Sequence, residues 1–127
     1  MQKQEHWRRL LLRTEKTATA YENAQEEQVA GSTCRLCADP EVIREYEHWR
    51  LMPNRFPYDR LFSKSDMLVL RRHSDEYGIR EDERAELLEL KTSVLVDEYD
   101  AFLEQLPKQR SIPHHFHVHL VQYRRPT

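Results

Sequence analysis

The chain has 127 residues, the length of a single domain with room for one additional element. Its 20 Lys and Arg residues nearly balance its 22 Asp and Glu residues, which disfavours a protein that mainly coats nucleic acid or an anionic membrane. Only 2 glycines occur, and neither has the spacing of a glycine-rich phosphate loop, so Rossmann-type and P-loop nucleotide sites are excluded.

The sequence predicts neither a membrane-spanning segment nor a secretory signal. No segment approaches the roughly 18 apolar residues that span a bilayer, and the N-terminal stretch offers only the leucines at 10–12 as a signal-peptide core. We therefore expect a cytoplasmic protein with no membrane partner and no strong nucleic-acid signal. In a reducing compartment, Cys34 and Cys37 indicate metal or redox chemistry rather than a disulfide framework.

The first half of the chain predicts one helix followed by short strands. Residues 4 to about 30 contain no Pro or Gly and carry apolar side chains at three- and four-residue spacing, which predicts an amphipathic helix that Gly31 stops. Residues 42–52 alternate weakly and predict a strand pair that ends at Pro53. Residues 67–70 form a short apolar run of strand length.

The second half predicts a long helix and a final strand. The helix is expected over residues 80–106, ending at Pro107. Its predicted buried stripe consists of Leu87, Leu90, Val94, Leu95, Tyr99, Phe102, Leu103 and Leu106. The strand is expected over residues 114–123. This order predicts an α+β fold with an antiparallel sheet and one long packed helix, in a domain over residues 32–127 that follows an N-terminal helical extension over residues 1–31.

The last strand carries an unusual concentration of histidine. Four of the 7 histidines fall within six residues, at positions 114, 115, 117 and 119. Because side chains alternate along a strand, His115, His117 and His119 share one face. The apolar residues Phe116 and Val118 lie on the opposite face, which is expected to pack against the long helix. The histidine face is therefore presented for chemistry.

Two kinds of chemistry fit this face. The three histidines together match a three-histidine catalytic metal site, whereas a single imidazole oriented by its neighbours matches a nucleophile. Cys34 and Cys37 have the spacing of half a zinc site and need two further ligands. His73 and His115, at the ends of neighbouring strands, are the candidates. If His115 binds that metal, His117 is left free to act.

A family resemblance brings these features together. Residues 115–121 read His-Phe-His-Val-His-Leu-Val and resemble the pattern His-φ-His-φ-His-φ-φ, with φ apolar, of the histidine triad (HIT) superfamily of nucleotide hydrolases and transferases. Residues 52–58 and 68–73 resemble the family's Asn-containing loop, strand and basic-basic-His turn. The Cys34-x-x-Cys37 pair resembles zinc-binding members, among them bacterial HIT proteins and galactose-phosphate uridylyltransferases. The likeness covers residues 34 to about 121.

The resemblance implies a HIT-like fold and a covalent reaction. His117 would attack the α-phosphorus of a nucleotide and form a nucleotidyl-histidine intermediate, and His119 would face the phosphate. Asn54 matches an asparagine near the nucleoside. Residues 108–113 have no clean match to the phosphate-binding segment of the family, and Gln109 and Ser111 are the candidates there.

The resemblance also implies a cofactor and partners. A structural zinc ion would be held by Cys34, Cys37, His73 and His115. The expected ligand is a purine nucleotide or nucleotide conjugate, turned over by a phosphoramidase or a dinucleoside polyphosphate hydrolase type of enzyme, and the chain is expected to form a homodimer. Two alternatives stay open: a three-histidine metal-dependent hydrolase, and a non-catalytic zinc-stabilised nucleotide-binding module.

Overall fold

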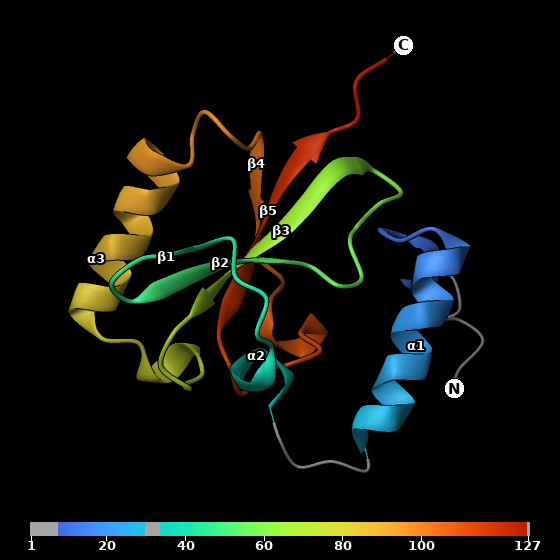
Figure 1. Cartoon of the computed structure of the whole chain (residues 1–127), viewed down its shortest axis with the longest axis horizontal. Helices are drawn as coiled ribbons and strands as arrows, with labels where there is room; N and C mark the ends of the chain where they lie inside the picture. The colour runs from blue at the N-terminus through green and yellow to red at the C-terminus, as the bar shows by residue number, and fades with distance from the viewer. Residues whose placement is uncertain (1–7, 30–33, 127) are drawn as a thin grey trace.

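A computed structural model describes residues 8–29 and 34–126 of the chain, with the side chains of residues 26–29 left aside. It is an α+β fold built on a five-stranded antiparallel sheet in the order β1-β2-β3-β5-β4 (Figure 1). The strands are β1 (Arg44–Glu45), β2 (Trp49–Pro53), β3 (Phe62–Leu70), β4 (Ala101–Leu103) and β5 (His117–Tyr123). The predicted class and the antiparallel sheet are confirmed.

Helices cover both faces of this sheet. The helices are α1 (Glu15–Val29), α2 (Arg35–Ala38) and α3 (Glu81–Glu89), with a π-helical turn η3 (Leu90–Val94) after α3 and short 3₁₀ turns η2 (Glu76–Gly78) and η4 (Pro107–Gln109). Figure 1 shows α3 on one side of the sheet and α1 on the other. No helix in the described part of the chain combines the length and apolar character needed to cross a bilayer.

Each face of the sheet carries its own buried cluster, as strand alternation requires. The cluster on the α3 side consists of Trp49, Leu51, Leu68, Leu70, Leu90, Leu95, Tyr99, Phe116, Val118 and Leu120. The smaller cluster on the opposite face consists of Leu36, Met52, Met67, Val69 and Ile112. Phe116 and Val118 thus anchor β5 against the α3 side, which leaves the intervening histidines on the other face.

The predicted helix over residues 80–106 is wrong beyond Val94. The chain leaves the helix after η3 and residues 101–103 form β4, in which Ala101 pairs with Val121 and Leu103 with His119. This pairing satisfies the backbone groups of β5 along an edge that would otherwise be open. Consequently Leu106, expected in the buried stripe, is 65% exposed.

Three other predicted boundaries also differ. In the described part of the first helix, residues 8–10 form a 3₁₀ turn and α1 begins only at Glu15, because the Thr14 hydroxyl accepts a hydrogen bond from the backbone N–H of Thr17 and caps the helix there. The predicted stop at Gly31 lies outside the described residues. Strand β3 begins at residue 62 rather than 67, and β5 begins at His117 rather than at 114, since residues 113–115 form a turn.

Candidate metal centre and histidine-lined cavity

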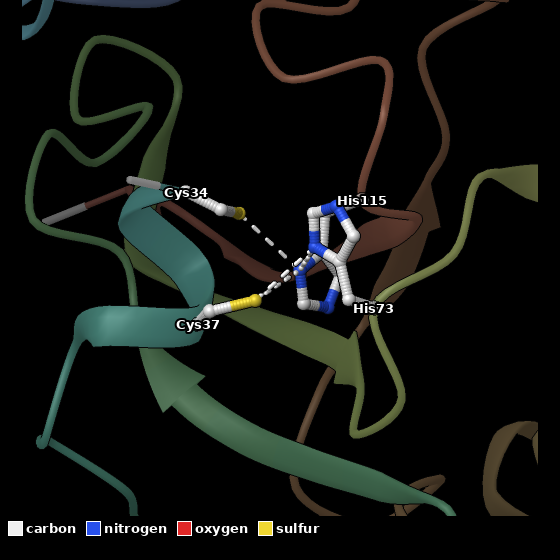
Figure 2. Close-up of side chains that lie close together, drawn as sticks. All are labelled: Cys34, Cys37, His73 and His115. Carbon is white, nitrogen blue, oxygen red and sulfur yellow. Dashed lines mark hydrogen bonds between the residues drawn. The ribbon is translucent and has the colours of Figure 1, made fainter. Parts of the chain in front are cut away.

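Two cysteines and two histidines from four different places in the chain converge beside the end of β5 (Figure 2). Cys34 precedes α2 and Cys37 lies within it, His73 follows β3, and His115 precedes β5. Their ligand atoms all lie within 4.8 Å of one another. These four residues can hold a metal ion, as the sequence predicted for them.

The distances between ligand atoms have the scale of one coordination sphere. The Sγ of Cys37 lies 3.1 Å from His73 Nδ1, and the Nδ1 atoms of the two histidines lie 3.2 Å apart. Both cysteine Sγ atoms lie 3.4 Å from His115 Nδ1. Tetrahedral ligands at ordinary Zn–N and Zn–S bond lengths lie about 3.3–3.8 Å apart, with two nitrogens closest and two sulfurs farthest. Four of the six distances between ligand atoms therefore approach those of a tetrahedral site, and the other two are at most 4.8 Å.

His115 is oriented for coordination by the backbone. Its Nε2 donates a hydrogen bond to the Leu70 carbonyl oxygen at 2.7 Å, so the Nδ1 lone pair points to the cysteines. The side chain is buried, and this burial lowers the pKa of His115 and favours the neutral ring that a metal requires.

The other two triad histidines line a cavity of about 460 Å³ on the same face of the sheet. The predicted substrate-binding residues Asn54 and Ser111 lie in its wall. The remaining lining residues are Arg13, Tyr21, Ala24, Arg35, Leu36, Ala38, Asp39, Pro40, Arg55, Phe56, Tyr58, Met67 and Ile112. The cavity falls within the size range of small-molecule sites.

His117 has one nitrogen engaged by the backbone and one free. Its Nδ1 donates to the His115 carbonyl oxygen at 3.0 Å, and Nε2 has no hydrogen-bond partner in the described part of the chain. Burial lowers the pKa of His117, which favours the neutral imidazole at pH 7. The arrangement leaves Nε2 with the lone pair that nucleophilic attack needs.

His119 lies deeper, against Tyr58. The Tyr58 hydroxyl and His119 Nε2 are 3.1 Å apart and the ring centroids 4.5 Å apart. Burial holds the pKa of His119 well below its usual range. Two buried polar atoms in the cavity wall, His119 Nδ1 and Asn54 Nδ2, have no partner in the described structure. Such unpaired groups are costly to leave unsatisfied and mark a place where a ligand can bind.

A second cavity, of about 340 Å³, adjoins the first. The two share Arg13, Tyr21, Tyr58, Ser111, His117 and His119. The predicted substrate-binding residue Gln109, on η4, lines the second cavity and accepts a hydrogen bond from Arg8 Nη1 at 3.3 Å. All three predicted substrate-binding residues therefore lie around the His117–His119 pair.

Several cavity residues were missed by sequence reasoning. Arg13 and Tyr21 come from the N-terminal extension, and Arg35 comes from α2. No local motif marks them. Arg13 and Tyr21 reach the cavity only through the docking of the extension on the loop before β3. Tyr58 lies in the Asn-containing loop of residues 52–58. Its contact with His119, 61 positions away, has no signal in the sequence.

His115, His117 and His119 do not form one metal-binding group. Among residues 8–29 and 34–126, the group of three or more converging ligand atoms is the Cys34, Cys37, His73 and His115 cluster. Both ring nitrogens of His115 are already directed elsewhere, one to this cluster and one to a backbone carbonyl. The geometry therefore gives no support to the three-histidine metal site.

The fold and site define an α+β chain with a candidate metal centre beside a histidine-lined cavity. Comparison with protein-family models, with curated proteins and with solved structures found no match to this chain. Membership of the histidine triad superfamily therefore stays a prediction.

Proposed function

We propose that this chain is a HIT-like nucleotide hydrolase or nucleotidyl transferase in which His117 is the nucleophile. The observation that carries the proposal is the hydrogen bond from His117 Nδ1 to the His115 carbonyl oxygen, which leaves Nε2 unpaired at the cavity. A neutral imidazole held in this tautomer is a competent nucleophile at neutral pH.

The reaction would proceed in two displacements at the α-phosphorus. In the first, Nε2 forms a bond to phosphorus, the bond from phosphorus to the leaving group breaks, and its electron pair departs with the leaving group. In the second, water or another acceptor forms a bond to phosphorus, loses a proton, and expels the His117 nitrogen. His119, which is neutral and buried beside His117, would contact the phosphate oxygens, and Asn54 would contact the nucleoside.

Zinc is the ion that best fits the metal cluster. Two cysteine thiolates and two imidazoles form a closed four-ligand set of the kind found in structural zinc sites, with no position left for water. The ion would join α2 to the end of β3 and to the turn before β5. It would hold the strand that carries His117 and take no part in the reaction.

The proposal is tested by AMP release. Purified protein is incubated with an adenosine phosphoramidate and with a dinucleoside polyphosphate, and the zinc content is measured on the same sample. We expect AMP release that falls by about 1,000-fold or more in His117→Ala while zinc is retained. The matched control is His114→Ala, which removes an exposed histidine from the turn just before β5.

The outcomes separate the alternatives. Retained turnover in His117→Ala would contradict the nucleophile assignment, and loss of zinc in that variant would favour a ligand role for His117. Nucleotide binding without turnover on either substrate would favour the non-catalytic nucleotide-binding module. For the metal, Cys34→Ser should abolish zinc binding; zinc that survives this change would point to the histidines as its ligands.

The resemblance also leads us to propose a homodimer. The exposed apolar side chains of Leu88, Val94 and Val96, on and after α3, are available for such a contact. Sedimentation velocity on the native chain tests the expectation, and a single species with the 15.4 kDa mass of the monomer would contradict it.

A further inference from the structure

The second cavity is built in part by a stretch of the chain that the family resemblance does not cover. Arg8, Arg9, Leu11, Leu12 and Arg13 line it together with the segment around η4. It opens on the same His117–His119 pair as the first cavity. A ligand attacked at His117 would therefore have room on both sides of the reacting atom.

The two cavities differ in chemistry. The first has apolar walls from Phe56, Met67 and Ile112, which suit a nucleoside. Apart from the residues that both cavities share, the second is lined by Leu11, Leu12 and polar or basic side chains, among them Arg9, Gln105 and Gln109. This difference suits a nucleoside in the first cavity and a polar leaving group in the second.

Arg13 lines both cavities, and its guanidinium is held in place by a hydrogen bond and two aromatic rings. Its Nε donates a hydrogen bond to the Phe56 carbonyl oxygen at 2.7 Å. Its guanidinium carbon lies 4.1 Å from the centre of the Tyr21 ring and 4.9 Å from that of Tyr58. Stacking on aromatic rings orients a guanidinium without neutralising it. The two terminal nitrogens have no hydrogen-bond partner in the described part of the chain, and they are left for a ligand.

The segment that carries Arg13 is anchored to the domain on both sides of it. The Asp59 carboxylate accepts from the Thr14 backbone N–H at 2.9 Å and from the Thr17 hydroxyl at 2.5 Å. The Arg60 backbone N–H donates to the Leu12 carbonyl oxygen at 3.0 Å. These hydrogen bonds on both sides of Arg13 fix its position relative to the sheet domain.

Three other arginines of these cavity walls are paired with carboxylates, whereas Arg13, like Arg35, has no ion pair within the described residues. Arg9 pairs with Glu22, Arg55 with Asp39, and Arg110 with both Glu76 and Glu104. Within the described residues, Arg13 has no carboxylate at ion-pair distance. Burial lowers the pKa of Arg13, yet an arginine stays charged in proteins. Asp59 favours the charged form of Arg13 only from beyond ion-pair distance. A desolvated cation with no paired carboxylate is costly, and an anionic ligand would reduce that cost.

We infer that Arg13 binds a phosphoryl group beyond the α-phosphate, so that the preferred ligands are nucleotides whose leaving group begins with a second phosphate. This inference rests on the proposed function. In the first displacement, the bond between the α-phosphorus and the bridging oxygen breaks and the leaving phosphate gains negative charge. The Arg13 guanidinium would donate to its oxygens and stabilise that charge. An uncharged leaving group would gain nothing from Arg13.

Binding of AMP, of α,β-methylene-ADP and of inorganic pyrophosphate, measured by titration calorimetry, tests the inference. The methylene bridge cannot be cleaved, so turnover does not interfere. We expect the native chain to bind α,β-methylene-ADP at least about tenfold more tightly than AMP. Arg13→Gln should bring this ratio to about one while changing AMP affinity by less than about threefold. Arg13→Lys, which keeps the charge, should restore part of the ratio.

Arg60→Gln is the matched control. The Arg60 guanidinium donates to the Leu10 carbonyl oxygen and does not line either cavity, so this variant weakens the anchoring of the extension without removing charge from the site. It should leave the ratio unchanged. An equal loss in Arg60→Gln would overturn the inference, since docking of the extension would then explain the effect. So would a native ratio near one, or a ratio that survives Arg13→Gln.

Pyrophosphate separates this inference from the proposed function. If no nucleotide binds but pyrophosphate binds and depends on Arg13, the proposed function fails and the phosphate site stands. If AMP is released from nucleotide conjugates but the ratio does not depend on Arg13, the inference fails and the proposed function stands. If nothing binds, both fail.

Discussion

His115 and His117 lie two residues apart and are prepared for opposite tasks. His115 gives its Nε2 hydrogen to the Leu70 carbonyl oxygen and turns Nδ1 to the cysteines, whereas His117 gives its Nδ1 hydrogen to the His115 carbonyl oxygen and leaves Nε2 free at the cavity. In each ring, a carbonyl, which can only accept, decides which nitrogen keeps its lone pair. The backbone therefore leaves a different nitrogen free in each ring, as the proposed metal-ligand role of His115 and the proposed nucleophile role of His117 require.

The largest effect is expected when His115, the proposed metal ligand, is replaced and the result is compared with replacement of His117. His115→Ala should lose the metal and lower the free energy of unfolding by about 4 kcal/mol, because it removes both a ligand and a fully buried side chain. His117→Ala should keep the metal and lower the free energy of unfolding by about 1 kcal/mol or less, because it removes no ligand. Zinc content and urea unfolding are measured on both variants. Metal retained in His115→Ala, or lost in His117→Ala, would contradict the separation of roles.

Much of the metal centre could be predicted from the sequence. The spacing of Cys34 and Cys37 indicates half of a metal site, and strand alternation puts the triad histidines on one face. Both features are local, so a sequence pattern can record them. The choice of His73 as a partner depended on expecting neighbouring strand ends to meet, which they do.

The cavity was much less predictable, because it is assembled by contacts between distant segments. Arg13 reaches it through the hydrogen bonds of Asp59 to α1, some 45 positions apart in the chain. The secondary structure of residues 95–106 also depends on contacts with residues distant in the sequence. The spacing of Tyr99, Phe102 and Leu103 suits a helix, and only the open edge of β5 makes a strand there the better solution. Periodicity alone cannot record such an edge.

A smaller effect is expected on the opposite face of the sheet, away from the histidines. The Glu83 carboxylate accepts from Arg72 Nε at 2.9 Å and from the Arg80 backbone N–H at 2.8 Å, and its side chain is only 3% exposed. Glu83→Gln should lower the free energy of unfolding by about 2 kcal/mol and leave the metal in place. Glu81→Gln, an exposed acid in the same turn of α3, should change it by less than about 0.5 kcal/mol.

The pH dependence of this contribution has a definite sign. The Arg72 guanidinium, followed by the Arg80 backbone N–H, lowers the pKa of Glu83 from 4.5 to about 2 against the opposing effect of burial. A depressed carboxyl pKa stabilises the fold fully above the unfolded value, and this stabilisation is lost as the pH falls from about 4.5 towards 2. The difference in free energy of unfolding between native chain and Glu83→Gln should shrink over that interval. A difference that stays constant from pH 7 to pH 3 would show that the charge of Glu83 is not what stabilises.

The smallest effect is expected for His119. Its ring contacts the Tyr58 hydroxyl, whereas the rings of His115 and His117 donate to backbone carbonyls. Tyr58→Phe removes the hydroxyl 3.1 Å from His119 Nε2 and keeps the ring on which Arg13 stacks. It should lower the free energy of unfolding by about 1 kcal/mol, because a buried imidazole nitrogen loses its partner.

Tyr21→Phe is the matched control, since its ring also contacts Arg13 but its hydroxyl bonds only to Gln25 among the described residues. Urea unfolding of the two variants side by side gives the comparison. Equal stability of Tyr58→Phe and the native chain would mean that His119 is held by packing alone, whereas a loss confined to Tyr58→Phe would assign the hydroxyl the orienting role that carbonyls have for His115 and His117.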